Sequence, residues 1–146
     1  MMVDKHPVKT KERAMEMQIS FPGNQKVQAR YKGFTVETDQ PANKGGDGSA
    51  PSPFDLFLVS LGTCAGFFTL RFLQQREIPT DNASIIMHVG ERDPQTHLVR
   101  HIDIELKLPA DFPEKYRAAV VRAAELCIVK QHIEQPPAFR IFATIG

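Results

Sequence analysis

Residues 52–76, SPFDLFLVSLGTCAGFFTLRFLQQR, decide the fold of this chain. Ser52 can cap a helix, Pro53 suits the first helical position, and Asp55 lies three residues after the cap, which completes a capping box. From residue 54 to about residue 76, apolar side chains occupy nearly every side of the expected helix. This pattern predicts a central helix that other elements wrap.

The composition is that of one soluble domain. The 146 residues are enough to bury one core, and 42% of them are hydrophobic while 24% are charged. The formal net charge of +1 gives no strong field for nucleic acid or anionic lipid. The uncharged stretch 56–70 is shorter than a membrane span, and the basic N-terminal residues have no apolar run behind them. We therefore expect a cytoplasmic protein without nucleic-acid or membrane partners, in a reducing compartment that disfavours a permanent disulfide.

The part of the chain before the helix predicts a small antiparallel sheet. Three short strands are expected, at residues 14–20, 26–32 and 33–38. Turns are expected at residues 21–24 and at the step from Lys32 to Gly33. The Gly- and Pro-rich segment 39–51 is either a functional loop or a flexible connector. Residues 1–13 are expected to form an N-terminal arm, and residues 14–146 a single domain.

The part of the chain after the helix predicts a hairpin, a second helix and a last strand. The hairpin strands are expected at residues 84–91 and 97–108. The second strand alternates, and its apolar residues share one face: Leu98, Ile102, Ile104, Leu106 and Leu108. A capping box from Asp111 to Glu114 opens the second helix, whose apolar stripe ends at Cys127. A short helical turn at residues 128–134 and a strand at residues 138–145 follow. The predicted fold class is α+β, a mainly antiparallel sheet packed on a central apolar helix and a second helix.

Cys64 and Cys127 are the candidate nucleophiles whose sequence surroundings are informative. Each is expected in an apolar helix, and without CxxC spacing they are either a redox pair or small core hydrophobes. Cys64 lies more than three turns past the helix start, so the dipole of its own helix does not lower its pKa. A reactive Cys64 therefore needs a nearby cation. The candidates are Arg71, two turns along the same face, and Arg30 on an early strand.

Histidine chemistry and metal binding have little support in the sequence. His132 follows Cys127 by five residues and is either the base of a cysteine hydrolase or an ordinary surface side chain. The histidines of the hairpin fit no zinc spacing with either cysteine. The sequence contains no P-loop and no dinucleotide-binding fingerprint. We therefore expect no metal and no bound cofactor.

Two motifs resemble the OsmC/Ohr family, the osmotically induced and organic-hydroperoxide-resistance proteins. The first is APSPFDLFLVSLGTC, residues 50–64, which follows a polar Gly-rich loop. The second is AELC, residues 124–127, and the order of the elements matches the family after about residue 14. The peroxidase branch has a glutamate where this chain has Phe54, so the resemblance is to the OsmC-like branch.

The resemblance implies an intertwined homodimer and a cysteine-based peroxidase for organic hydroperoxides. The thiolate of Cys64 would attack the peroxide and become a sulfenic acid, and Cys127 would condense with it to a disulfide. An external dithiol reductant, lipoyl-linked in characterised relatives, would restore both thiols. Apolar walls from Phe57, Phe67 and Phe68 would favour bulky hydroperoxides. The alternative on the same fold is a redox-sensing or small-molecule-binding module without turnover.

Overall fold

The computed structural model describes residues 15–146, which form two compact units. The first unit contains residues 15–56 and 138–146, and the second contains residues 57–137. The predicted N-terminal arm, residues 1–13, lies outside the described residues, and the assignment of residues 14–146 to one domain stays a prediction.

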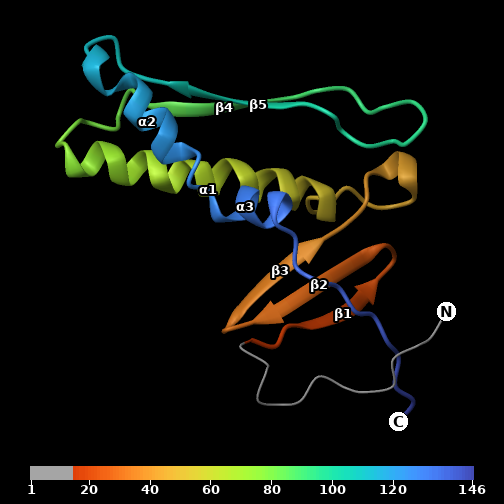
Figure 1. The fold of residues 1–146 in the computed structure, drawn as a ribbon. Helices are drawn as coiled ribbons and strands as arrows, with labels where there is room; N and C mark the ends of the chain where they lie inside the picture. The colour runs from red at the N-terminus through yellow and green to blue at the C-terminus, as the bar shows by residue number, and fades with distance from the viewer. Residues whose placement is uncertain (1–14) are drawn as a thin grey trace. The chain divides into compact units, whose positions relative to one another are not determined.

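The first unit contains a three-stranded antiparallel sheet in the order β1-β2-β3 (Figure 1). Its strands are β1 (Gln18–Gly23), β2 (Lys26–Tyr31) and β3 (Phe34–Thr38). Both central residues of the second turn, Lys32 and Gly33, have positive φ angles, of 45° and 79°. This conformation matches the right-handed twist of the flanking strands, and the predicted turn is confirmed.

The first predicted turn, at residues 21–24, lies two residues too early. Strand β1 continues to Gly23, and the chain reverses at Asn24, whose φ is 44°. Asparagine tolerates this left-handed backbone better than most residues do. Pro22, which favoured the earlier turn, lies on an edge strand where the register shifts between Ser20 and Gly23. An edge strand with a bulge accepts proline, because the missing N–H then breaks no ladder hydrogen bond.

Segment 39–51 is organised around one buried carboxylate, that of Asp39, which is 1% exposed. The carboxylate accepts hydrogen bonds from the backbone N–H of Gln40 (2.8 Å), the N–H of Asp47 (3.3 Å) and both the N–H (3.0 Å) and hydroxyl (2.7 Å) of Ser49. Asp47 in turn accepts from the amine of Lys26 at 2.9 Å, which ties the segment to β2. These hydrogen bonds make segment 39–51 an ordered loop rather than a flexible connector.

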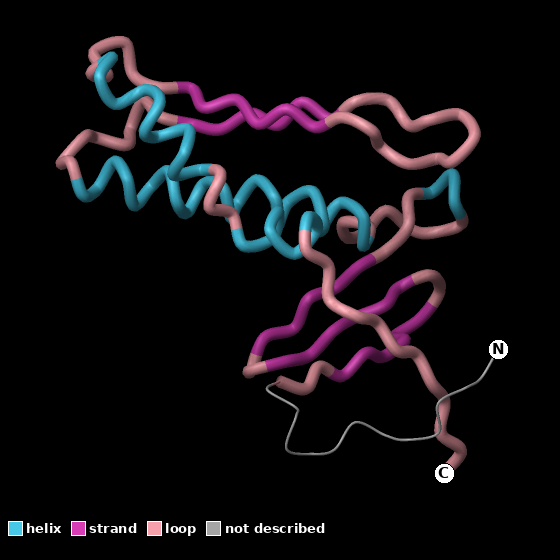
Figure 2. The backbone as a smooth tube through the Cα atoms, viewed as in Figure 1, coloured by secondary structure: helices cyan, strands magenta, loops and turns pink. Residues whose placement is uncertain are grey.

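No strand forms at residues 138–145, so that prediction is wrong. The alternation of apolar residues suits a strand, but a strand needs a neighbouring edge to pair with. The strands of the described residues pair only among themselves, and residues 138–145 run as irregular chain (Figure 2). Phe139 and Ile141 are 84% and 95% exposed.

Helix α1 (Pro53–Gln75) begins as predicted. The backbone N–H of Ser52 donates to the Asp55 carboxylate (3.0 Å), and the N–H of Asp55 donates to the Ser52 hydroxyl (3.2 Å), so the capping box is confirmed. One face of α1 is buried, through Leu61, Ala65, Thr69, Phe72 and Leu73. The prediction that other elements wrap the helix on every side is wrong for this single chain, because several large apolar side chains are exposed: Phe57, Val59, Phe67 and Leu70.

The composition of α1 is strongly apolar over most of its length. By length and composition alone, α1 could cross a membrane. The core helix of a soluble protein meets the same two criteria, so the predicted absence of a membrane partner stays a prediction.

The hairpin of the second unit consists of β4 (Ser84–Val89) and β5 (Ile102–Lys107), paired antiparallel from Ser84↔Lys107 to Val89↔Ile102. An isolated bridge between Arg92 and Val99 continues the same register toward the tip. The hairpin and its direction are confirmed, whereas both strands are shorter than predicted. Ile102, Ile104 and Leu106 share one side of β5, as the alternation predicted.

The second predicted helix is divided into a 3-10 turn, η3 (Glu114–Tyr116), and α2 (Arg117–Ala124), and α3 (Ile128–Glu134) follows. The predicted capping box is wrong, because Pro113 precedes η3 and no side chain caps it. Phe72 and Leu73 of α1 pack against Val120 of α2, and apolar residues of the hairpin complete this core. Residues 15–146 contain two antiparallel sheets and three α-helices, so the α+β class is confirmed.

Candidate functional site

The fold of the second unit brings Cys64 and Cys127 together. Cys64 is partly buried on α1, and Cys127 is 2% exposed. Both are free thiols, and each shifts the pKa of the other. Cys127 does not lie in a helix as predicted. Helix α2 ends at Ala124, and Cys127 is the N-cap of α3.

The start of α3 supplies N–H donors to both sulfur atoms. The backbone N–H of Lys130 donates to the Cys127 Sγ at 3.4 Å. The N–H groups of Ile128 and Val129 interact with the thiol of Cys64. The first N–H groups of a helix have no partner within it, so two sulfur atoms at this end satisfy donors that would otherwise need water. The Cys127 thiol itself donates a long contact, 3.9 Å, to the carbonyl of Leu61 on α1.

These contacts shift the two pKa values in opposite directions. Burial raises the pKa of Cys64, but the N–H of Val129, the thiol of Cys127 and the N–H of Ile128 together lower it below the ordinary value. Burial raises the pKa of Cys127, and the neighbouring Cys64 raises it further, against the N–H of Lys130. The thiolate is the reactive form of cysteine, so Cys64 is the better nucleophile of the pair.

The sequence missed the source of this effect. From the sequence, only the dipole of the helix that carries Cys64 could be assessed. The N–H donors that lower the pKa of Cys64 belong to α3 instead. The available signal was the position of Cys127 directly before the expected helix at residues 128–134, where a side chain can cap.

The two cations that the sequence predicted near Cys64 are Arg71 on α1 and Arg30 on β2. Among the described residues, the groups that shift the pKa of Cys64 are the N–H donors and Cys127, and Arg71 is not one of them. Arg71 lies with its guanidinium 5.8 Å from the ring centre of Phe67. It also borders a cavity of about 240 Å³ with Phe68. Arg30 lies exposed on β2 in the first unit, and its role stays a prediction.

The three phenylalanines predicted to form apolar walls lie in two different settings. Phe68 lines the cavity with Arg71, together with Phe72 and Leu126. Phe57 and Phe67 are 37% and 52% exposed, so within this chain they are surface residues.

His132 is placed unfavourably for a base. Its Nδ1 donates to the carbonyl of Ile128 at 2.7 Å, within its own helix, and the side chain is exposed. His88 lies 2.8 Å from the carboxylate of Glu105, on the polar side of the hairpin. No group of three or more His, Cys, Asp or Glu side chains in residues 15–146 could hold a metal ion.

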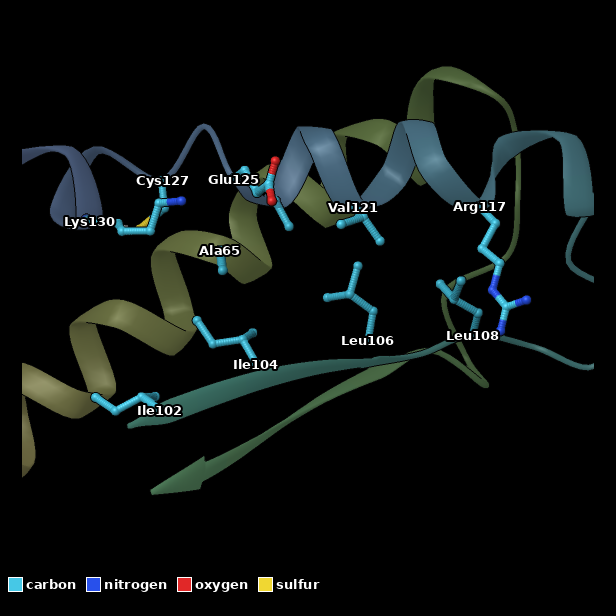
Figure 3. Close-up of a pocket in the computed structure, with 11 residues that line it drawn as sticks. Ala65, Ile102, Ile104, Leu106, Leu108, Arg117, Val121, Glu125, Cys127 and Lys130 are labelled. Atoms are coloured by element: carbon cyan, nitrogen blue, oxygen red, sulfur yellow. Dashed lines mark hydrogen bonds between the residues drawn. The ribbon is translucent and has the colours of Figure 1, made fainter. Parts of the chain in front are cut away.

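A cavity of about 330 Å³ lies beside the cysteine pair (Figure 3). Cys127 and Ala65 border it, and an aliphatic stripe forms most of its wall: Ile102, Ile104, Leu106, Leu108 and Val121. Its polar lining residues are Arg117, Glu125 and Lys130. The sequence predicted the apolar face of β5 but not this space, because a cavity depends on how α1, α2 and the hairpin meet.

The site therefore consists of one thiol on a long helix and a second thiol beside it, within an α+β fold. The sequence matches the OsmC-like protein family over residues 46–142. The chain therefore belongs to the OsmC-like family, and the resemblance seen in the two motifs is confirmed.

Solved structures share the fold at low sequence identity. An osmotic stress induced and detoxification response protein from Psychrobacter arcticus has a TM-score of 0.67 and 20% identity, covering 79% of this chain and 85% of its own. An organic hydroperoxide resistance protein from Vibrio cholerae, solved with captopril in one active site, has a TM-score of 0.56 and 19% identity, covering 88% and 89%. A Legionella pneumophila organic hydroperoxide resistance protein has a TM-score of 0.53 and 16% identity, covering 84% and 90%. No curated protein matches the sequence.

Proposed function

We propose that this chain has a redox stress role, as a thiol-dependent peroxidase that reduces organic hydroperoxides. The observation that carries the proposal is the contact between two free thiols whose pKa values are shifted apart, with Cys64 lowered and Cys127 raised. A pair of this kind supplies one thiolate to attack and one thiol to resolve. Family membership and the names of two structural neighbours, organic hydroperoxide resistance proteins, support the same role.

The first step uses Cys64 alone. Its thiolate attacks one oxygen of the hydroperoxide, the O–O bond breaks, and the alcohol leaves after taking up a proton. Cys64 is then a sulfenic acid. The N–H groups of Ile128 and Val129 stabilise the thiolate before the attack.

The second step uses Cys127. Its sulfur attacks the sulfur of the sulfenic acid, water leaves with the hydroxyl group and the Cys127 proton, and a Cys64–Cys127 disulfide forms. An external dithiol then reduces the disulfide and becomes a disulfide itself. We expect this reductant to be lipoyl-linked, and no metal or bound cofactor to take part.

An organic substrate suits the apolar surroundings. The cavity beyond Cys64 on the same helix is bordered by Phe68, Phe72 and Leu126, with Arg71 at its edge. Burying apolar groups of the hydroperoxide there contributes about 25 cal/mol per Å² of surface removed from water. Hydrogen peroxide has no such surface.

We also propose that the chain works as a cytoplasmic homodimer. Large apolar side chains are exposed on α1, α2, α3 and the first sheet, beyond what single surface residues account for: Ile19, Phe21, Phe34, Phe57, Val59, Phe67, Leu70, Val121, Ile128 and Ile133. A second copy would cover such faces. Light scattering of the purified protein tests this, and a monomer would contradict it.

The deciding experiment is the consumption of cumene hydroperoxide and hydrogen peroxide by reduced protein with excess dithiol. We expect turnover that prefers the organic peroxide and falls to the rate without protein in Cys64→Ser. If wild-type protein shows no turnover and both thiols remain reduced, the peroxidase proposal is wrong.

One observation favours a second function, a small-molecule-binding or redox-sensing module without turnover. The 330 Å³ cavity has the size of a small-ligand site. Oxidation of Cys64 in a single event, without reduction by any dithiol, would identify this alternative.

A further inference from the structure

The cysteine pair is approached by an apolar cavity from one side. Cys127 borders the 330 Å³ cavity, and so does Ala65, the neighbour of Cys64, whereas Cys64 itself does not. Since Cys127 is only 2% exposed, a molecule reaches its sulfur by entering this cavity.

The lining of the cavity selects the kind of molecule that enters. Its wall is the aliphatic stripe of β5 with Val121, and Figure 3 shows Arg117 at the opposite end from Cys127. Arg117 pairs with Glu114 at 3.2 Å, and Lys130 pairs with Glu134 at 3.7 Å. Both cations of the lining therefore have partners already, and the third charged lining residue, the carboxylate of Glu125, would repel an anionic thiol. An uncharged aliphatic chain suits this space better than a charged, hydrophilic thiol does.

Thiol–disulfide exchange also has a preferred direction. The attacking thiolate bonds to one sulfur and expels the other, and the sulfur with the lower pKa leaves faster. The N–H donors of α3 make Cys64 that sulfur. Both the better leaving group, Cys64, and the position of the cavity therefore favour attack on the sulfur of Cys127.

We propose that the reductant, a dithiol with an uncharged aliphatic chain, enters this cavity and attacks the sulfur of Cys127 rather than that of Cys64. This inference rests on the proposed peroxidase function, which supplies the disulfide. One thiolate of the reductant bonds to the Cys127 sulfur, the Cys64–Cys127 bond breaks, and Cys64 leaves as a thiolate. The second thiolate of the reductant then attacks its partner sulfur, forms the oxidised reductant and releases Cys127, which takes up a proton. Two electrons pass from the dithiol to the protein.

The first test traps the mixed disulfide. The protein is oxidised with diamide, and formation of the disulfide is verified by intact mass. It is then exposed briefly to octanethiol, the exchange is stopped with excess N-ethylmaleimide, and peptides are mapped by mass spectrometry. We expect the octyl group on Cys127 and the maleimide on Cys64. The reverse pattern would overturn this inference alone, and failure of diamide to form the disulfide would overturn the proposed function beneath it.

The second test fills the cavity. Ile104→Phe places a larger side chain on its wall, and the matched control Ile86→Phe places the same ring on the other strand, at a residue outside the lining. Reduction of the diamide-formed disulfide is followed with dihydrolipoamide and with dithiothreitol, after circular dichroism shows that both variants are folded.

We expect Ile104→Phe to lower the rate of disulfide reduction by dihydrolipoamide about tenfold or more. A few misplaced methylene groups in an apolar pocket have an effect of this size. The rate of reduction by dithiothreitol, which is small and polar, should fall much less. With both reductants, Ile86→Phe should be reduced at the wild-type rate. Equal slowing of both reductants by Ile104→Phe, or no slowing of either, would overturn the assignment of the cavity.

Discussion

The first and second units each contain a buried acceptor group surrounded by backbone N–H donors. In the first unit, the carboxylate of Asp39 accepts from Gln40, Asp47 and Ser49. In the second, the sulfur atoms of Cys64 and Cys127 accept from the first residues of α3. The two arrangements differ in the acidity of the acceptor, and this difference decides what each can do.

The hydrogen bonds from Ser49, with those from Gln40 and Asp47, lower the pKa of Asp39 to about 2. That carboxylate is therefore charged throughout the neutral range, and its donors only hold a loop in place. A thiol ionises near neutral pH, so a modest shift of its pKa changes the fraction of thiolate. The same type of contact thus stabilises structure in one unit and prepares chemistry in the other.

The largest expected effect separates the roles of the two thiols. In Cys127→Ser, Cys64 should still reduce one equivalent of cumene hydroperoxide per chain and then stop, because no thiol resolves the sulfenic acid. Dimedone labelling and mass spectrometry should find the sulfenic acid in this variant and not in Cys64→Ser. Sustained turnover in Cys127→Ser would show that the pair does not act as proposed.

A smaller effect is expected from removing the acceptor of the first unit. Asp39→Ala leaves the donors of the loop without their acceptor and should lower the melting temperature without changing the reactivity of Cys64. The comparison variant is Ser52→Ala, which loses a helix cap worth about 1 kcal/mol. We expect Asp39→Ala to lower the melting temperature more than Ser52→Ala does. A smaller loss would mean that Asp39 does not hold the loop.

The dependence of unfolding stability on acid pH should also report on Asp39. The pKa of Asp39 is about 2 in the folded chain, and an unfolded aspartate has a pKa of about 3.9. The stability that this carboxylate contributes is therefore complete above about pH 4 and is lost as the pH falls toward about 2. Urea unfolding midpoints between pH 5 and pH 2 should fall less steeply in Asp39→Asn. Identical slopes in the two proteins would contradict the shift.

The smallest expected effect concerns the acidity of Cys64. Its alkylation by iodoacetamide should reach half its maximal rate at a lower pH in the folded protein than in urea, because the donors of α3 favour the thiolate. Cys127→Ala removes one donor and should raise that midpoint slightly. A midpoint at or above that of the unfolded chain would show that α3 does not act on Cys64.

Features that depend on neighbouring residues followed from the sequence. The capping box at the start of α1 joins residues three apart, and the turn at Lys32 and Gly33 lies within two residues. The alternation along β5 also predicted its apolar side. Each of these follows from local geometry, in which the pattern and the structure span the same few residues.

Features that need a distant partner did not follow. The expected strand at residues 138–145 has a suitable pattern but no edge to pair with among the described residues. The buried role of Asp39 depends on Ser49, ten residues later, within a loop that the sequence left open as a connector.

The α+β class, the long helix that carries Cys64 and the family motifs around both cysteines all followed from the residue pattern alone. Two features emerged from the packing of distant segments: the sulfur of Cys127 lies beside Cys64, and N–H groups of α3 lower the pKa of Cys64. These features involve residues far apart along the chain, whose contact no local pattern encodes. The two thiols lie 63 positions apart, and their contact exists only because α1, α2 and the hairpin pack into one core.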